Sequence, residues 1–436
     1  MKYIKWLFSS VLSVIFLFSA MACSMAKSGA DGAYAPSGYG GVTGSMTMDM
    51  EDAAGETIDS EKNEVSSVEE IVKKPAGLIT AAAWNDNTYF EDWKKLFEAN
   101  TPNEQGKFVQ FTQQNWGFTS QNRIKVTSKN GETPIPGTKV TLLNEENKAV
   151  FSAVSDANGV AYVFTDKVEG EILVSCGEAV ETLSFTAENR DLTVEFNELC
   201  YPSPKLDVIE LMFVVDVTGS MGDELEFLKN EIADVMQRVA TANAGVEIRL
   251  AMLYYRDHGD EEVFSYHDFV TVTGELGEKG LQAQQAVLDS QYANGGGDYP
   301  EAVDEALELA VNQQWSTGVT TKMIFHVLDA PPHAEQTNKT KYYDAVLTAA
   351  EKGIRFCPVL CSGAAALTEY LAREAAVYTG GTFVFVTDDS GIGNAHHDPN
   401  LPNAVVEGLN SLMVRLINGY HTGTFAPPVP WREEVK

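Results

Sequence analysis

Basic residues are scarce in this sequence. Its 436 residues include 31 Lys and Arg against 62 Asp and Glu, which gives a formal charge of −31 at pH 7. Phosphate binding needs clustered cations, so this balance argues against a nucleic-acid partner. It also argues against docking of the folded part onto an anionic lipid surface. We expect an acidic, solvated surface instead.

The amino terminus lacks a hydrophobic run of membrane-spanning length. The apolar segment at residues 6–18 is too short to cross a bilayer. Because it follows Lys2 and Lys5 and precedes small residues, residues 1–22 read as a removable secretory signal.

The residues Ala-Met-Ala-Cys at positions 20–23 resemble a bacterial lipoprotein box, with Ala20 where leucine is usual. The resemblance implies that Cys23 is lipidated and becomes the first mature residue. Acyl chains on one cysteine give stable anchoring, since each buried methylene adds ~0.8 kcal/mol. We therefore expect export and a lipid anchor in the bacterial cell envelope, facing the periplasm or the outside. An ordinary cleaved signal with an incidental thiol is the alternative.

Cysteine is rare as well, with five in the chain. Cys176 and Cys200 fall in one predicted β domain and could form a disulfide after export, which would stabilise the fold by roughly 3 kcal/mol. Cys357 and Cys361 lie four apart in one predicted strand, ~13 Å from each other, so they cannot pair while that strand is regular. We expect both to be small core residues.

Familiar catalytic motifs are absent. The sequence has no His-Glu-x-x-His, no nucleophile elbow and no credible Ser/His/Asp arrangement. The triple glycine at residues 295–297 is not followed by Gly-Lys-Ser/Thr, so it is not a phosphate loop. We therefore expect a protein that is not an enzyme.

The amino-terminal part divides by composition. Residues 23–75 are rich in Gly, Ser, Ala, Met and Glu and read as a disordered tether. Residues 76–117 are rich in aromatic side chains, among them Trp84, Trp93 and Trp116. Helical spacing around Trp93 favours packing that docks this segment onto a neighbouring domain, with a sugar-binding platform as the alternative.

Residues 118–200 contain several short strands separated by turn signals such as Asn130-Gly131. This spacing predicts a small antiparallel β-sandwich. The segment Pro136-Gly137-Thr138-Lys139-Val140, followed by strands after the turn at residues 156–159, resembles transthyretin-like or carboxypeptidase regulatory-like β domains. We expect a spacer without catalytic function.

Strands alternate with helices over residues 206–420, which predicts an α/β domain with a doubly wound, mostly parallel sheet; residues 421–436 remain as a tail. The apolar run at residues 211–215 ends at Asp216, and a later strand, residues 323–328, ends at Asp329. Right-handed crossovers would bring both strand ends to one edge of the sheet, where ligands bind.

The loop after the first strand offers only oxygen donors. Asp216, Thr218 and Ser220 supply one carboxylate and two hydroxyls at alternate positions. Such donors suit Mg²⁺, Mn²⁺ or Ca²⁺ far better than zinc or copper. The sequence therefore predicts a divalent cation at an open site.

These features together resemble a von Willebrand factor type A domain, a family that carries a metal-ion-dependent adhesion site. Its first loop, Asp-x-Ser-x-Ser, is matched by Asp216, Thr218 and Ser220, and its third-loop aspartate by Asp329. Its second-loop threonine is missing here, and Asp298 in Gly-Gly-Gly-Asp-Tyr-Pro-Glu takes its place. Asp298 could instead cap the helix that follows.

The resemblance implies a fold, a cofactor and a kind of partner. It implies a Rossmann-like α/β fold that holds Mg²⁺, or Mn²⁺ or Ca²⁺, and binds a protein ligand through an acidic side chain. The alternatives are an envelope scaffold with a structural metal site and, less favoured, a metal-dependent hydrolase.

Overall fold

A computed structural model describes residues 79–98, 107–197, 207–387, 401 and 404–434. All of them belong to one compact unit, residues 71–436. The expected signal, the tether, Cys23 and Cys200 lie outside the described residues.

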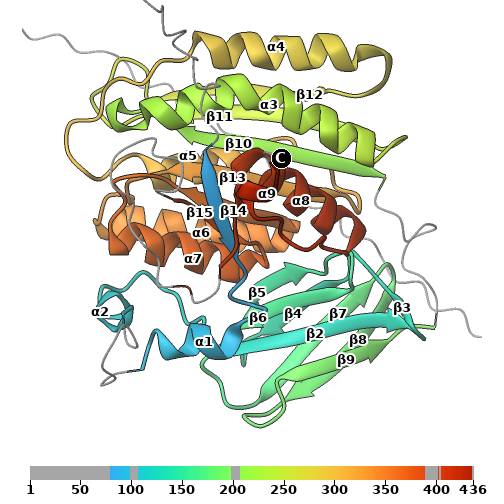
Figure 1. Ribbon diagram of the computed structural model, residues 1–436. Helices are drawn as coiled ribbons and strands as arrows, with labels where there is room; N and C mark the ends of the chain where they lie inside the picture. The colour runs from blue at the N-terminus through green and yellow to red at the C-terminus, as the bar shows by residue number, and fades with distance from the viewer. Residues whose placement is uncertain (1–78, 99–106, 198–206, 388–400, 402–403, 435–436) are drawn as a thin grey trace, which may run out of the picture. The chain divides into compact units, whose positions relative to one another are not determined.

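An eight-stranded sheet forms the centre of the α/β part, in the order β12-β11-β10-β13-β14-β15-β1-β16 (Figure 1). β10, β11, β13, β14 and β15 run parallel, whereas β12 and β1 pair antiparallel to their neighbours. The predicted α/β fold with a mostly parallel sheet is therefore confirmed. The strands are β1 (Thr80–Trp84), β10 (Val208–Asp216), β11 (Glu247–Tyr255), β12 (Phe264–Thr271), β13 (Thr321–Leu328), β14 (Ile354–Leu360), β15 (Phe383–Val386) and β16 (Val406–Gly408).

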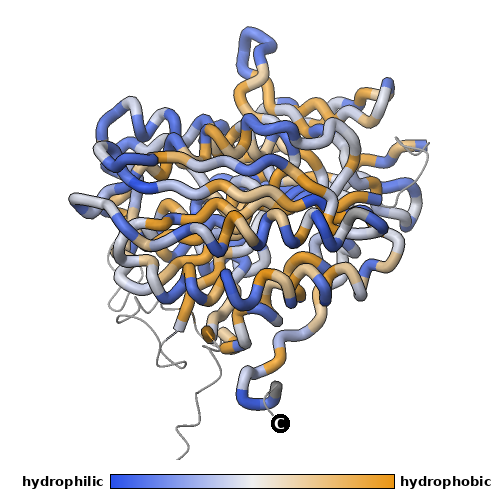
Figure 2. The backbone as a smooth tube through the Cα atoms, turned by 90° about the horizontal axis from the view of Figure 1, so that it is seen from above, coloured by the Kyte–Doolittle hydropathy of each residue, from blue (hydrophilic) through white to orange (hydrophobic). Residues whose placement is uncertain are grey.

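Helices cover both faces of this sheet (Figure 1). Alternate residues of β10 point to opposite faces of the sheet. On one face, Leu211 and Phe213 pack with α3 (Gly222–Ala242), α4 (Gly277–Ser290) and α8 (Leu409–Thr422). On the other face, Met212 and Val214 pack with α5 (Val303–Val311), α6 (Gln336–Lys352) and α7 (Ala366–Thr379). The short helix α9 (Trp431–Glu434) follows near the end of the chain. Hydrophobic segments run through the interior strands in Figure 2, and hydrophilic segments follow the loops. A strand buried on both faces carries a near-continuous apolar run, as β10 does from Leu211 to Val215.

The aromatic segment 76–117 supplies a strand that lies outside the predicted domain at residues 206–420. β1 pairs antiparallel with β15, with Ala81 opposite Val386, and with β16, with Thr80 opposite Gly408. Its sequence, Thr-Ala-Ala-Ala-Trp, has little strand propensity of its own. The neighbouring strands therefore determine its conformation.

Residues between β1 and β10 form a β-sandwich. Its two four-stranded sheets are β3-β2-β6, with β9 on the free side of β2, and β5-β4-β7-β8. β2 and β9 pair in parallel, which the antiparallel expectation did not include. The elements are α1 (Phe90–Lys95), α2 (Val109–Thr112), β2 (Arg123–Asn130), β3 (Thr133–Pro134), β4 (Lys139–Leu143), β5 (Ala149–Val154), β6 (Val160–Phe164), β7 (Gly170–Cys176), β8 (Ala179–Phe185) and β9 (Asp191–Glu195).

Aromatic side chains join the sandwich to the α/β part in one continuous hydrophobic cluster. Phe164 of β6 stacks on Tyr378 of α7 with ring centroids 4.4 Å apart. Beside them, buried Arg373 of α7 donates to both carboxyl oxygens of Asp86, at 2.6 and 3.0 Å. Packing therefore fixes the sandwich against α7, and the buried ion pair fixes the turn after β1 to the same helix.

Cys176 is disulfide-bonded, while its expected partner Cys200 lies outside the described residues. Cys357 and Cys361 are free and buried. No helix in the described ranges has both the length and the apolar character needed to cross a membrane.

Candidate metal centre

The predicted metal residues lie where the strand order changes direction. From β10 the chain passes to β11 on one side, and it later returns to β13 on the other side. Asp216 ends β10, and Asp329 follows the last residue of β13. In open α/β sheets, ligands bind at the carboxyl edge of the strands at such a switch point. The fold therefore places the two aspartates at the expected position for a ligand site.

Thr218 fixes the carboxyl group of Asp216. Its backbone N–H and its hydroxyl both donate to Oδ1 of Asp216, at 2.9 and 2.7 Å. Oδ2 of Asp216 is buried and has no hydrogen-bond partner within the described residues. A buried polar atom without a partner is rare, because it loses its hydration without compensation. Oδ2 is thus available to a ligand.

Asp329 is joined to the same first loop by Ser220, whose side chain hydrogen-bonds to its carboxyl group. Burial raises the pKa of Asp329, and the bond from Ser220 opposes that rise. Asp329 is 5% exposed. The three loop residues Asp216, Thr218 and Ser220 and the aspartate after β13 therefore form one cluster of oxygen atoms.

The glycine-rich loop lies against this cluster. The backbone N–H of Gly219 donates to the carbonyl of Gly295 at 3.3 Å. Gly296 has a φ of +71°, and a Cβ atom there would lie 2.9 Å from Oε1 of Glu301 and 3.4 Å from Cβ of Thr218. Only glycine combines this backbone conformation with so close an approach. Gly296 therefore lets the Glu301 carboxyl come close to Thr218.

Glu301 is the acid of this loop that the sequence analysis missed. It is 5% exposed, and its Oε2 has no partner within the described residues. Burial raises the pKa of Glu301 to about 9, helped by the charges of Asp216 and Asp257. Burial also raises the pKa of Asp216 to about 7, helped by Asp329. The ionised forms of these acids are unfavourable together, and a cation would offset their repulsion.

Asp298, by contrast, lies on the surface of the loop. Its side chain makes no hydrogen bond or ion pair with any described residue. It does not cap the next helix, because α5 begins at Val303 and its cap position is Ala302. The signal that could have pointed to Glu301 is its place at the end of the same motif, where a turn can direct a side chain inward.

Buried polar contacts hold the glycine-rich loop in place. Arg256 donates from Nε to the carbonyl of Asn294 and from Nη2 to that of Tyr292, both at 3.0 Å. Oδ2 of Asp260 accepts from the backbone N–H of Gly296 at 3.0 Å. Such contacts around a metal site orient the groups that bind the ion.

The donor set fits a hard cation. No group of three or more His, Cys, Asp or Glu side chains is arranged to hold a metal within the described ranges. Two aspartates and two hydroxyls are a sparser set, of the kind that leaves coordination positions to water or to a ligand. The buried, unpartnered Oδ2 of Asp216 is the atom that such a cation would satisfy.

Comparison with known proteins agrees with this fold. Residues 210–364 match the family described as von Willebrand factor A domain. The alpha-protein kinase vwkA of Dictyostelium discoideum is 25% identical over 130 residues, which cover 30% of this chain and 20% of that protein. A putative ariadne-like RING finger protein of Acanthamoeba polyphaga mimivirus is 28% identical over 135 residues, which cover 31% of this chain and 12% of that protein. The chain therefore matches a fifth or less of the length of these relatives.

Two solved structures show a more distant likeness. The conserved hypothetical protein BatB from Bacteroides thetaiotaomicron has 16% identity and a TM-score of 0.33, covering 49% of this chain and 98% of that one. The pilus adhesin SpaC from Lactobacillus rhamnosus GG has 11% identity and a TM-score of 0.29, and the match covers 41% of this chain and 31% of that one. The sheet order, the loop cluster and the family match agree that this chain contains a von Willebrand factor A domain at residues 210–364.

Proposed function

We propose that the von Willebrand factor A domain holds Mg²⁺, or Mn²⁺ or Ca²⁺, through Asp216, Thr218, Ser220 and Asp329, and uses it to bind a protein. Glu301 is a buried acid of the glycine-rich loop whose charge interacts with those of Asp216 and Asp329, and we assign it the second-loop role first expected of Asp298. The observation that carries the proposal is the buried Oδ2 of Asp216 at the switch point of the sheet, for which the described part of the chain offers no partner.

The chemistry of hard cations indicates the kind of partner. Magnesium prefers six oxygen ligands and keeps several water molecules. An acidic side chain of a partner can replace one of these waters, and its attraction to the cation strengthens as the contact excludes solvent. We therefore propose adhesion or interaction with a protein ligand that offers a carboxylate. No catalytic step is assigned to the site.

We also propose that Cys23 carries a lipid anchor and that the folded part is exported to the bacterial cell envelope. The motif at residues 20–23 and the preceding hydrophobic segment support this. The membrane contact is then made by the lipid alone. Metabolic labelling with a palmitate analogue should label the wild type and not Cys23→Ala; equal labelling would contradict the proposal.

Calorimetric titration with Mn²⁺ and Mg²⁺ tests the metal site. The wild type should bind one ion, and Asp216→Ala should bind none while keeping its circular dichroism spectrum. Asp344→Ala removes an exposed acid of α6 and should bind like the wild type. Equal binding by Asp216→Ala would refute the site.

Capture from envelope extracts then tests the function. Proteins retained by the wild type in Mg²⁺ should be lost in EDTA and lost with Asp216→Ala. A protein that binds metal but retains the same partners in EDTA would have a structural metal site only.

A further inference from the structure

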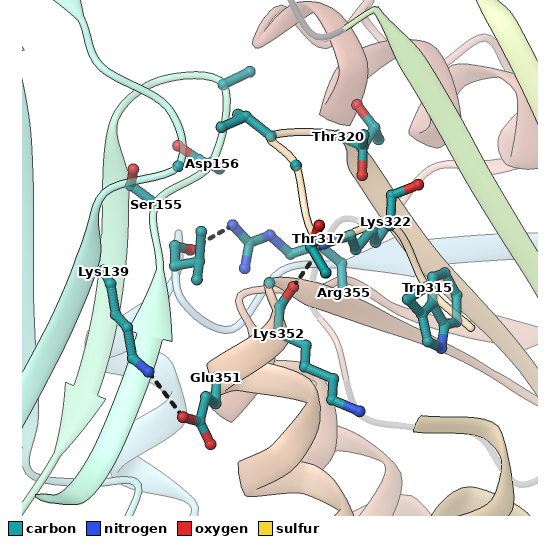
Figure 3. Close-up of a pocket in the computed structure, with 18 of the residues that line it drawn as sticks. Lys139, Ser155, Asp156, Trp315, Thr317, Thr320, Lys322, Glu351, Lys352 and Arg355 are labelled. Carbon is teal, nitrogen blue, oxygen red and sulfur yellow. Dashed lines mark hydrogen bonds and ion pairs between the residues drawn. The ribbon is translucent and has the colours of Figure 1, made fainter. Parts of the chain in front are cut away.

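A second site lies at the opposite end of the sheet. A cavity of about 450 Å³ is lined by the end of β5 and the turn after it, by the loop before β13, and by the start of β14 (Figure 3). It therefore opens at the amino end of β13, next to Thr321, whereas Asp329 follows the carboxyl end of that strand. The length of β13, about 25 Å, separates the cavity from the metal centre.

Among the residues that the structure describes, three cations in the wall of this cavity hydrogen-bond to backbone carbonyls alone. Nζ of Lys322 donates to the carbonyl of Lys352 at 3.2 Å, and Nζ of Lys352 donates to that of Val311 at 2.8 Å. Arg355 donates to the carbonyls of Thr379 and Val154, at 2.8 and 2.9 Å. None of the three forms an ion pair with a described residue. Each ammonium keeps unused N–H donors.

The nearby acids are already engaged. Burial lowers the pKa of Lys322, and the charge of Glu210 opposes that shift. The two oxygens of Glu210 are engaged, because they accept from Ser316 at 2.8 Å and from Thr320 at 3.2 Å, and Glu210 pairs with Arg249. At the rim, Glu351 pairs with Lys139 at 2.8 Å.

The remaining acid of the lining, Asp156, accepts two backbone N–H groups of its own turn at 2.9 Å. The lining thus holds four cations, namely Lys139, Lys322, Lys352 and Arg355, against Asp156 and Glu351. In a chain of charge −31, this local excess of positive charge is opposite to the overall balance.

Aromatic side chains supply the apolar part of the lining. Trp315 and Tyr420 are 8% and 7% exposed and both border the cavity. The indole of Trp315 is fixed, because Nε1 donates to the carbonyl of Ala310 at 2.9 Å. A volume in this range, with apolar walls and a few convergent polar groups, is typical of small-molecule sites.

We propose that this cavity binds a small organic anion. Its carboxylate, phosphate or sulfonate group accepts hydrogen bonds from Lys322 and Lys352, and its apolar part lies against Trp315. Lys322 is 7% exposed and forms no ion pair with a described residue, so an anion there would give its ammonium group a direct counter-ion. The site does not depend on the metal centre.

A matched pair of probes tests the charge requirement. 8-Anilinonaphthalene-1-sulfonate carries an anionic group on an aromatic body, and N-phenyl-1-naphthylamine has nearly the same body without the charge. The folded protein in EDTA should bind the sulfonate, with energy transfer from Trp315, at least about tenfold more tightly than the neutral amine. Inorganic phosphate should displace the sulfonate. Equal binding of the two probes, or no effect of phosphate, would overturn the proposal.

Variants place the probe in the cavity. Lys322→Gln should weaken sulfonate binding at least about tenfold, as expected for loss of a hydrogen bond to a charged group. Lys352→Gln changes a less buried side chain and should weaken binding in the same direction if Lys322→Gln fails to fold. Lys279→Gln removes an exposed charge on α4 and should bind like the wild type. Wild-type affinity in folded Lys352→Gln, or an equal loss in Lys279→Gln, would contradict the assignment.

Discussion

Thr218 donates its backbone N–H and its hydroxyl to the same oxygen of Asp216, at 2.9 and 2.7 Å. The two bonds fix the orientation of the carboxyl group, and its second oxygen is buried with no partner among the described residues. Fixing the orientation of a group in advance lowers the reorganisation needed when a ligand binds.

The two acids of the glycine-rich loop can be told apart by substitution. If Glu301 takes part in the metal centre, Glu301→Gln should weaken Mn²⁺ binding by roughly tenfold or more, even if it acts only through an intervening group. Asp298→Asn should leave the affinity nearly unchanged, because Asp298 is exposed. Calorimetric titration with Mn²⁺ measures the affinity of each variant. A large loss in Asp298→Asn with none in Glu301→Gln would return the role to Asp298.

The metal-free protein should become less stable as the pH rises. The folded-state pKa of Asp216 is about 7 and that of Glu301 about 9, both above their unfolded values near 4. The folded state therefore holds more protons than the unfolded state over this interval, so the free energy of unfolding falls as the acids ionise. The thermal midpoint in EDTA should drop between about pH 5 and pH 9.

Glu301→Gln serves as the control for this pH dependence, because it removes one titrating group and should reduce the slope. Added Mg²⁺ should raise the midpoint more at high pH than at low pH, since ionised acids bind the cation. If Glu301→Gln left the slope of the thermal midpoint against pH unchanged, other groups would be the cause of the pH dependence.

Removing the guanidinium group that pairs with Asp86 should destabilise the protein strongly. Arg373 is 2% exposed and is the ion-pair partner of Asp86, so Arg373→Met would leave a buried carboxylate without compensation. The expected loss is roughly 3–5 kcal/mol in urea unfolding. Arg238→Met, which breaks an exposed pair with Asp234, should change stability by less than about 1 kcal/mol. If the two variants lost the same free energy of unfolding, the Arg373–Asp86 pair would contribute little to stability.

A fragment that begins at residue 206 should be unstable. It lacks β1, so β15 would lose a paired neighbour and β16 would lose the strand to which it is hydrogen-bonded. A fragment that begins at residue 71 keeps β1 and should unfold at the midpoint of the full chain. Thermal unfolding of both fragments measures the difference, and equal midpoints would show that β1 is dispensable.

The sequence predicted the parts of this structure that depend on local pattern. The apolar strands and the acids at their ends, Asp216 and Asp329, follow from periodicity and crossover handedness, and the structure places both at one edge. The place of Glu301 at the end of the glycine-rich motif is a sequence signal, but its burial depends on the backbone conformation of Gly296, which that signal does not reveal. β1 was missed because a run of alanines has no strand signature until its neighbours are known.

The position of β1 also decides how the chain would carry mechanical force. In sequence order, the β-sandwich stands between the amino-terminal segment and the strands that end at Asp216 and Asp329. In space, β1 belongs to that sheet, and the sandwich is an excursion from it. A pull on the segment before residue 80 would therefore reach the sheet through β1 first. The sandwich would lie outside the path of the force, so with the proposed anchor and ligand its unfolding would not lengthen the connection between them.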